Sequence, residues 1–273
     1  MSDATSISTF PNTHAASSAM HTFAIVTCAL SLVGVLTGAM VTSSGGTSFV
    51  EPHHMTAGLA GIAALGLGIW MAAKQIGRMG LWIAALALAA VGLGFAPQTT
   101  AVTVSHALAA QMLFALTMGS ILLTGSAWSK PPERVADHGW PSLRSLGTLT
   151  PILVVIQIAL GAAFRHKAMG VLPHLFGAMV LVLAILCVCI FVMQQFPTHP
   201  ALRPSANQLM AIAFTQIFLG IAAFTVRTMT IKAAGVVIGV TAAHACVGAM
   251  TLGAALMLAM QIRRNVFKPA PEE

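Results

Sequence analysis

The chain has 273 residues, of which 57% are hydrophobic and only 7% charged, and its mean hydropathy is +0.88. Soluble domains carry about 25% charged residues, so this composition excludes an ordinary soluble domain. The formal net charge is +7, and the basic residues lie at the ends of apolar segments. They are not clustered with aromatic residues, as they are on a nucleic-acid-binding surface. We therefore expect a polytopic membrane protein with lipid as its surroundings and no nucleic-acid partner.

Eight apolar stretches follow one another along the chain, and each is long enough for the roughly 18–20 residues that a membrane helix needs. They cover residues 21–42, 54–73, 79–96, 103–127, 147–164, 172–194, 207–226 and 234–260. Residues 1–20 contain no Lys or Arg, which a signal peptide carries before its apolar region. The first stretch is therefore expected to remain in the membrane.

The basic residues are divided unequally between the two sides of the membrane. The tails and the second, fourth and sixth connections hold nine: Lys74, Arg78, Lys130, Arg134, Arg144, Arg203, Arg263, Arg264 and Lys268. The other side holds four: Arg165, Lys167, Arg227 and Lys232. Because cytoplasmic loops carry the excess of Lys and Arg, both termini are predicted to be cytoplasmic, in a membrane of the bacterial inner-membrane type.

Short patterns recur in the two halves of the chain. The repeated pairs are Gln157 to Gly161 with Gln216 to Gly220, Pro52-His53 with Pro173-His174, and Val102 to Ala107 with Val240 to Ala245. Four helices in each half give both halves the same orientation. The predicted fold is an all-α membrane protein with eight transmembrane helices in two pseudo-repeated four-helix bundles. The expected parts are a tail (1–20), a first bundle (21–127), a cytoplasmic linker (128–146), a second bundle (147–261) and a tail (262–273).

The ten histidines fall into two groups. His14, His21, His138 and His199 lie in predicted cytoplasmic tails and loops, where a solvated surface is expected. His53, His54, His106, His166, His174 and His244 lie toward the opposite helix ends. A lone intramembrane histidine is more often a hydrogen-bonding residue between helices than a ligand. However, each half repeats one histidine in its second helix and one in its fourth, and two imidazoles on facing helices are what a heme iron needs.

Other metals fit less well, because zinc takes three or four ligands and the four cysteines are not at ligand spacing from these histidines. Glu51 stands just before the second apolar stretch. It is either a carboxylate stabilised by the helix N-terminus or a proton-handling partner beside a porphyrin. Arg165 and Arg227 end the fifth and seventh stretches, where they would either pair with heme propionates or anchor the membrane interface.

The sequence resembles the heme A synthase family of cytochrome oxidase assembly proteins over essentially all eight stretches. The resemblance is carried by Gln157 to His166 (QIALGAAFRH), Ser105-His106-Ala107, Gln216 to Ala223 (QIFLGIAA) and Ala243-His244 with Val247-Gly248-Ala249. It implies two four-helix bundles, with resident heme B held by His174 and His244. His106 with His53 or His54 would receive heme O as substrate, and Glu51 occupies about the place of a glutamate implicated in catalysis.

The implied reaction oxidises the C8 methyl group of heme O to a formyl group, giving heme A for terminal oxidases. An unidentified electron donor, heme O synthase and oxidase subunits are the candidate partners. The spacing from Glu51 selects His54, whereas the Pro-His repeat selects His53, which we favour. The family's arginine after the histidine and its loop cysteine pair are missing here. A non-catalytic membrane cytochrome b and a heme-handling assembly factor therefore remain alternative functions.

The charge distribution makes a prediction about topology. Reporter tags at the N-terminus and the C-terminus should both be protected from a membrane-impermeant label in intact cells, because the basic side of the chain faces the cytoplasm. Labelling of the C-terminal tag from outside would reverse the predicted orientation.

Overall fold

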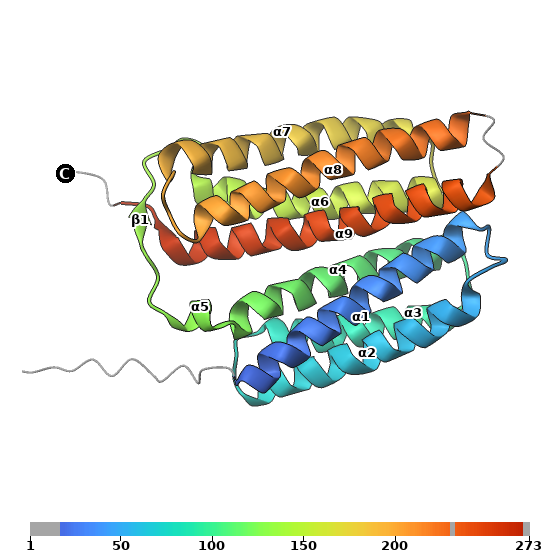
Figure 1. The fold of residues 1–273 in the computed structure, drawn as a ribbon, viewed down its shortest axis with the longest axis horizontal. Coiled ribbons are helices and arrows are strands. Elements are labelled where there is room, and N and C mark those ends of the chain that lie inside the picture. The colour runs from blue at the N-terminus through green and yellow to red at the C-terminus, as the bar shows by residue number, and fades with distance from the viewer. Residues whose placement is uncertain (1–16, 230–232, 270–273) are drawn as a thin grey trace, which may run out of the picture.

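The computed structural model describes residues 17–229 and 233–269, which are almost entirely helical (Figure 1). The elements in chain order are α1 (Ser18–Ser43), α2 (Val50–Ala73), α3 (Met79–Phe95), α4 (Thr100–Thr124), α5 (Ser126–Ser129), β1 (Val135–Ala136), α6 (Leu143–Arg165), α7 (Leu172–Gln195), α8 (Leu202–Thr228), α9 (Ala234–Asn265) and β2 (Val266–Phe267). His14 lies outside the described residues.

Within the described ranges, seven helices are long and apolar enough to cross a bilayer, and α3 is a shorter apolar helix of 17 residues. Large apolar side chains project from their outer faces, including Ile62, Phe95 and Phe218, which are 74%, 88% and 69% exposed. Such side chains suit contact with lipid, because lipid chains are as apolar as the side chains themselves. The chain is therefore a multi-pass, all-α membrane protein.

Several helices begin earlier than the apolar pattern indicates, because capping residues lie upstream of the apolar stretch. The Thr99 hydroxyl accepts a hydrogen bond from the Val102 amide at 3.3 Å, and the Ser142 hydroxyl accepts one from the Ser145 amide at 3.2 Å. These hydroxyls satisfy amides that a helix start leaves free. The first turns of α4 (TAVT) and α6 (LRSL) mix polar and apolar residues, so they lie outside the continuous apolar stretches.

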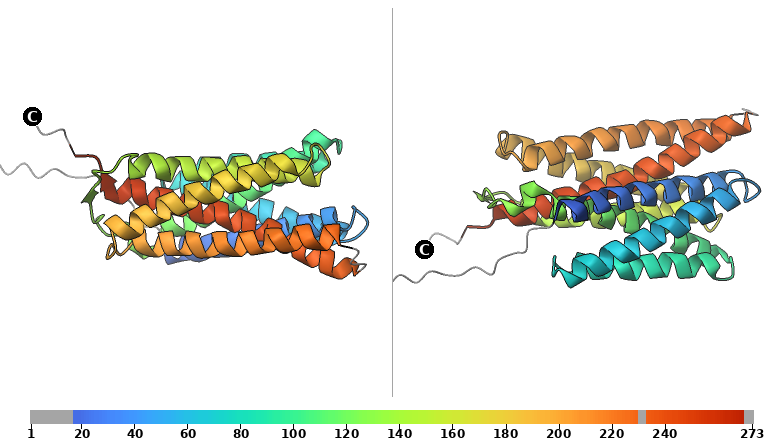
Figure 2. Two further views of the ribbon diagram at one scale, coloured as in Figure 1. Left: turned by 90° about the horizontal axis from the view of Figure 1, so that it is seen from above. Right: turned by 60° about the horizontal axis from the view of Figure 1, so that its bottom comes forward.

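The long helices form two groups that run along a common axis (Figures 1 and 2). In the first group, contacts join α1 to α2, α2 to α3, α3 to α4 and α4 back to α1, and α6 to α9 close a second ring in the same way. The groups meet through α1, α4, α6 and α9. Cys28, Val35, Phe114 and Ala249 form the apolar cluster at this boundary.

Small residues let neighbouring helices approach closely. A methyl group added at Gly68 on α2 would lie 2.6 Å from the Gly80 carbonyl oxygen on α3, and one added at Gly80 would lie 2.7 Å from the Gly68 oxygen. Glycines at such close contacts are typical of packed membrane helices. Because lipid supplies no hydrophobic drive for association, the helices associate through close packing.

The segment between the two groups is held against the helix ends. Asp137 is buried, and its carboxylate accepts hydrogen bonds from the Gly139 and Leu143 amides at 2.9 and 2.6 Å. Strand β1 pairs in parallel with β2. The guanidinium of Arg264 lies over the Trp128 ring, 4.2 Å from its centroid. The predicted linker (128–146) therefore begins within α5, contains strand β1 and ends within the first turn of α6, and it contacts the end of α9.

The expectation that His199 is solvated is wrong, because its side chain is only 4% exposed. Its Nε2 lies 2.9 Å from the Glu133 carbonyl oxygen, and its Nδ1 accepts hydrogen bonds from the Ala201 and Leu202 amides at the start of α8. The position of His199 in a loop does not predict its burial, because its hydrogen-bond partners come from the start of α8 and from Glu133 in the linker. His138 is exposed, and His21 Nδ1 lies 3.1 Å from the Thr124 hydroxyl.

Candidate functional site

The intramembrane histidines lie toward one end of the molecule. His53, His106 and His174 stand near the starts of α2, α4 and α7, and His244 lies in the third turn of α9. Figure 1 shows the starts of α2 and α9 at the end opposite the C-terminus. The helix order therefore brings together residues that are far apart in the sequence.

These four imidazoles form two pairs. The ring centroids of His53 and His106 are 6.0 Å apart with an interplanar angle of 83°, and those of His174 and His244 are 6.3 Å apart with an angle of 90°. In each ring of helix contacts, the two helices that carry a pair are not adjacent. Each pair therefore joins side chains from two helices that face each other across the interior of their group.

Each of the four rings rests against a glycine of the preceding long helix. A methyl group added at Gly38, Gly161 or Gly220 would lie 2.9, 2.9 or 3.1 Å from Cε1 of His53, His174 or His244, respectively. At Gly94 the distance to His106 Cε1 would be 3.5 Å, an ordinary contact. The absent side chain makes room for an imidazole between two helices. A methyl group at Gly38 or Gly161 would force the ring to shift, and one at Gly220 would press on the ring more weakly.

Hydrogen bonds hold Nδ1 of three of these rings. His53 Nδ1 lies 3.2 Å from the Thr37 hydroxyl, His106 Nδ1 lies 2.9 Å from the Ala90 carbonyl oxygen, and His174 Nδ1 lies 2.9 Å from the Gln157 amide nitrogen. A carbonyl can only accept, so His106 carries its proton on Nδ1 and leaves the Nε2 lone pair free. Fixing one ring nitrogen through an outer partner is typical of metal-binding histidines.

His54 and Glu51 lie on a different face of α2 from His53. At about 100° per residue, Glu51 and His53 are separated by roughly 160° around the helix, whereas Glu51 and His54 share a side. Both Glu51 and His54 are exposed. Within the described residues the Glu51 side chain makes no hydrogen bond. The structure thus brings His53, and not His54, to His106, and it leaves Glu51 at the helix start, turned away from that pair.

Arg165 contacts the first group of helices. Its guanidinium donates to the Ala39 carbonyl and, at 2.5 Å, to the Ser43 hydroxyl, both on α1, and to the Thr241 carbonyl on α9 at 3.4 Å. Arg165 therefore joins α6 to α1 and α9. Arg227 is exposed, and its side chain makes no hydrogen bond to any described residue. The buried Nε of Arg165 has no partner among the described residues, so it and the exposed Arg227 guanidinium are the donors available to an anionic ligand.

The sequence patterns missed two parts of this arrangement. The sequence comparison does not identify Gly94 as the fourth glycine, although Leu93-Gly94 repeats Leu160-Gly161 and Leu219-Gly220. His166, just beyond α6, was given no role. Its pKa is lowered by burial, by the adjacent Arg165 and by His106, so it lies near the first imidazole pair although it follows a helix of the second group.

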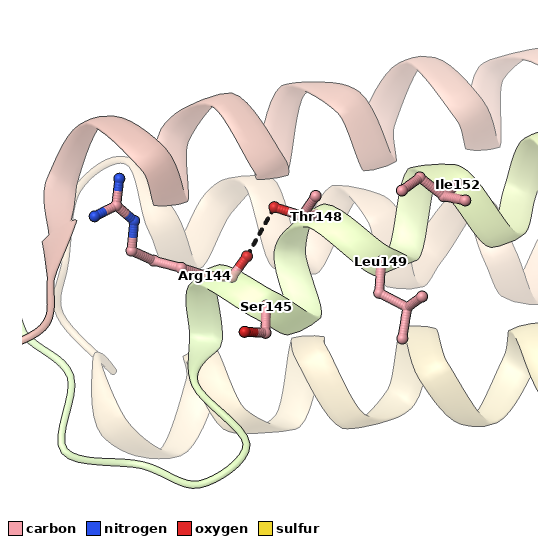
Figure 3. Close-up of a pocket in the computed structure, with 5 residues that line it drawn as sticks. All are labelled: Arg144, Ser145, Thr148, Leu149 and Ile152. Atoms are coloured by element: carbon pink, nitrogen blue, oxygen red, sulfur yellow. Dashed lines mark hydrogen bonds between the residues drawn. The ribbon is translucent and has the colours of Figure 1, made fainter.

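Among residues 17–229 and 233–269, no group of three or more His, Cys, Asp or Glu side chains is placed to hold a metal ion. The donor set is therefore two imidazoles at each pair. A shallow surface hollow lies elsewhere, at the start of α6, and is lined by Arg144, Ser145, Thr148, Leu149 and Ile152 (Figure 3). It is at the opposite end of that helix from Gly161, so it takes no part in the histidine site.

Comparison with known proteins found no matching family model and no matching curated protein. The chemistry of the site is therefore inferred from its own side chains.

The glycine contacts predict a graded effect of adding one methyl group. Gly38→Ala and Gly161→Ala should each destabilise the protein by about 1–3 kcal/mol, as overpacking does, because the rings of His53 and His174 are held in place by hydrogen bonds. The measurement is unfolding of the detergent-solubilised protein followed by circular dichroism.

Gly94→Ala is the matched control. Its methyl group would make an ordinary contact, and alanine favours a helix over glycine by about 0.5–1 kcal/mol. It should be neutral or stabilising. Equal losses in all three variants would contradict the proposed packing of the rings.

Proposed function

We propose that the chain binds heme between its two imidazole pairs and acts as a heme A synthase-like oxidoreductase. In this proposal eight helices span the membrane, α3 included, as two repeated four-helix bundles. The histidine pairs lie toward the non-cytoplasmic face of a bacterial-type inner membrane. The second bundle keeps heme B between His174 and His244, and the first receives heme O between His53 and His106.

The observation that carries the proposal is the separation of the paired rings. Because an imidazole nitrogen binds a transition metal at about 2 Å, two imidazoles on opposite sides of one iron have centroids roughly 6 Å apart. The observed 6.0 and 6.3 Å agree with this value. The donor set of two imidazoles from facing helices also suits axial ligation.

Bound heme would supply the oxidation chemistry, and the protein would bind and orient the porphyrin. His174 and His244 would hold the resident group, while His53 and His106 would fix the substrate. The candidates for pairing with a propionate are the exposed Arg227 and the unpaired Nε of Arg165, whose terminal nitrogens are bonded to α1 and α9. Glu51 is the candidate proton acceptor at the edge of the substrate site.

One observation favours a second candidate function, a membrane cytochrome b that carries electrons without modifying heme. Glu51 lies on the side of α2 away from His53, so its carboxylate would contact a bound substrate only at the outer end of the first bundle. Pigment extracted from protein made in cells that contain heme O separates the two functions. Heme A beside heme B supports the synthase, and heme B alone supports the cytochrome or a heme-handling assembly factor.

The pairing of the rings predicts which histidines hold resident heme. His174→Ala and His244→Ala should each abolish the low-spin, bis-imidazole spectrum of the second bundle, because iron would lose one axial ligand. Reduced-minus-oxidised spectra of the purified variants provide the measurement. His138→Ala, at an exposed linker position, is the control, and unchanged spectra in both site variants would refute the assignment.

The position of Glu51 predicts an effect on chemistry without an effect on folding. Glu51→Gln should assemble with normal heme B and accumulate heme O, because positioned acid–base groups contribute about 10²–10⁴-fold to rate. Loss of one exposed carboxylate should leave stability nearly unchanged.

Heme extraction followed by chromatography measures the heme A to heme O ratio in Glu51→Gln. Glu133→Gln, which alters an exposed acid in the linker, is the matched control. Heme A at the parent level in Glu51→Gln would leave Glu51 only a role at the helix terminus.

A further inference from the structure

The start of α6 carries a surface hollow that the histidine site does not use. Its lining consists of Arg144, Ser145, Thr148, Leu149 and Ile152 (Figure 3). These residues cover about two and a half turns of the helix, with the polar side chains at the helix start and the apolar ones further along. The hollow therefore has a charged part and an apolar part, which is the character of a site for an amphiphilic ligand.

The charged part of the hollow brings together arginines from two helices. Arg144 lies in the first turn of α6, is exposed, and donates no side-chain hydrogen bond to any described residue. Arg263, in the last turn of α9, donates to the Thr148 hydroxyl at 3.4 Å. This bond places a second guanidinium at the edge of the hollow.

Neither guanidinium has a carboxylate partner within residues 17–229 and 233–269. Asp137 is the acid that lies closest to Arg144 along the chain. It is buried, and both of its carboxylate oxygens accept backbone amides, one of them at the start of α6. Because its oxygens are used inside the protein, the two exposed arginines remain free to pair with an anion from the surroundings.

The apolar part of the hollow continues along the lipid-facing side of α6. Leu149, Ile152 and Ile156 are 47%, 52% and 49% exposed. At 1.5 Å per residue, Ile156 lies roughly 18 Å beyond Arg144 along the helix. The hydrocarbon of one leaflet is about half of the roughly 30 Å core of a bilayer. The apolar strip is therefore long enough to contact most of one acyl chain.

An exposed tryptophan indicates the depth at which this hollow lies. Trp140, four residues before Arg144, is 94% exposed. Tryptophan is enriched where the bilayer meets water, at the level of the lipid headgroups. The start of α6 then lies among the headgroup phosphates, and the apolar strip lies among the acyl chains.

We propose that the hollow at the start of α6 binds one anionic phospholipid. Its phosphate pairs with Arg144 and Arg263, since a guanidinium presents several donors to phosphate oxygens. Its acyl chain lies along Leu149, Ile152 and Ile156. The apolar strip selects a lipid over a soluble phosphate, which would use the charged part alone. This site goes beyond the proposed function, because it lies at the other end of the molecule from the histidine pairs and does not depend on heme.

The test is native mass spectrometry of the full-length protein in detergent, titrated with dioleoylphosphatidylglycerol. The parent should bind one molecule of this lipid more tightly than further molecules. Arg144→Gln and Arg263→Gln should each weaken that first binding step about fivefold, because a basic residue beside an anionic lipid contributes about 1 kcal/mol. Arg144→Lys keeps the charge and should bind more tightly than Arg144→Gln.

Arg203→Gln is the matched control. Leu202-Arg203 at the start of α8 repeats Leu143-Arg144 at the start of α6. Arg203 is also exposed, but its guanidinium donates to the Pro197 carbonyl of its own loop. Its replacement removes the same charge from the same end of the molecule and should leave the first binding step unchanged.

Two competitors separate the lipid from its parts. Neither dioleoylphosphatidylcholine nor inorganic phosphate at the same concentration should displace the first bound phosphatidylglycerol. Displacement by either one, or equal losses in all three glutamine variants, would overturn the inference. If a variant fails to fold, the parent still provides the test, because its preference for the anionic lipid should fall at high salt. A preference that salt does not change would also overturn the inference.

Discussion

The close contact between an imidazole ring and a glycine on the preceding helix determines where the histidine pairs of this protein lie. His53, His174 and His244 each lie where a single added methyl group would come within about 3 Å of the ring. The contact places each ring between its own helix and the preceding one. The second imidazole of the pair lies 6.0 or 6.3 Å away between ring centroids.

The same contact between a glycine and an imidazole occurs in both groups of helices. In each half one long helix supplies a glycine near its end and the next supplies a histidine, and this happens twice. The two histidine-bearing helices then face each other across the bundle. A single such contact would make an ordinary hydrogen-bonding histidine, whereas two of them make a site with two opposed nitrogen donors, which suits a group with two axial positions.

Polar partners distinguish the halves from each other. The first half holds its rings with the Thr37 hydroxyl and a peptide carbonyl, and the second holds the His174 ring with the Gln157 carboxamide. Arg165 then joins the halves by bonding groups on α1 and α9. A buried guanidinium with several acceptors costs much less than an unpaired one, so this contact stabilises the boundary between the groups.

The sequence predicts the membrane helices and the choice of His53, for physical reasons that differ between these features. The apolar stretches gave the membrane helices, and the Pro-His repeat distinguished His53 from His54 because both bundles need the ring at the same turn. The partners of Arg165 and the burial of His199 were not predictable, since they depend on how segments distant in sequence meet. The apolar pattern does not predict the helix starts at Thr100 and Leu143, because the hydroxyl caps Thr99 and Ser142 precede the apolar stretches.

Electron paramagnetic resonance of the oxidised, purified protein would show whether the paired imidazoles bind a heme iron between them. Ring planes at 83° and 90° predict low-spin ferric signals of the strongly anisotropic kind given by perpendicular axial imidazoles. A high-spin ferric signal alone, from iron with one imidazole or none, or pigment-free protein without any ferric heme signal, would contradict the account.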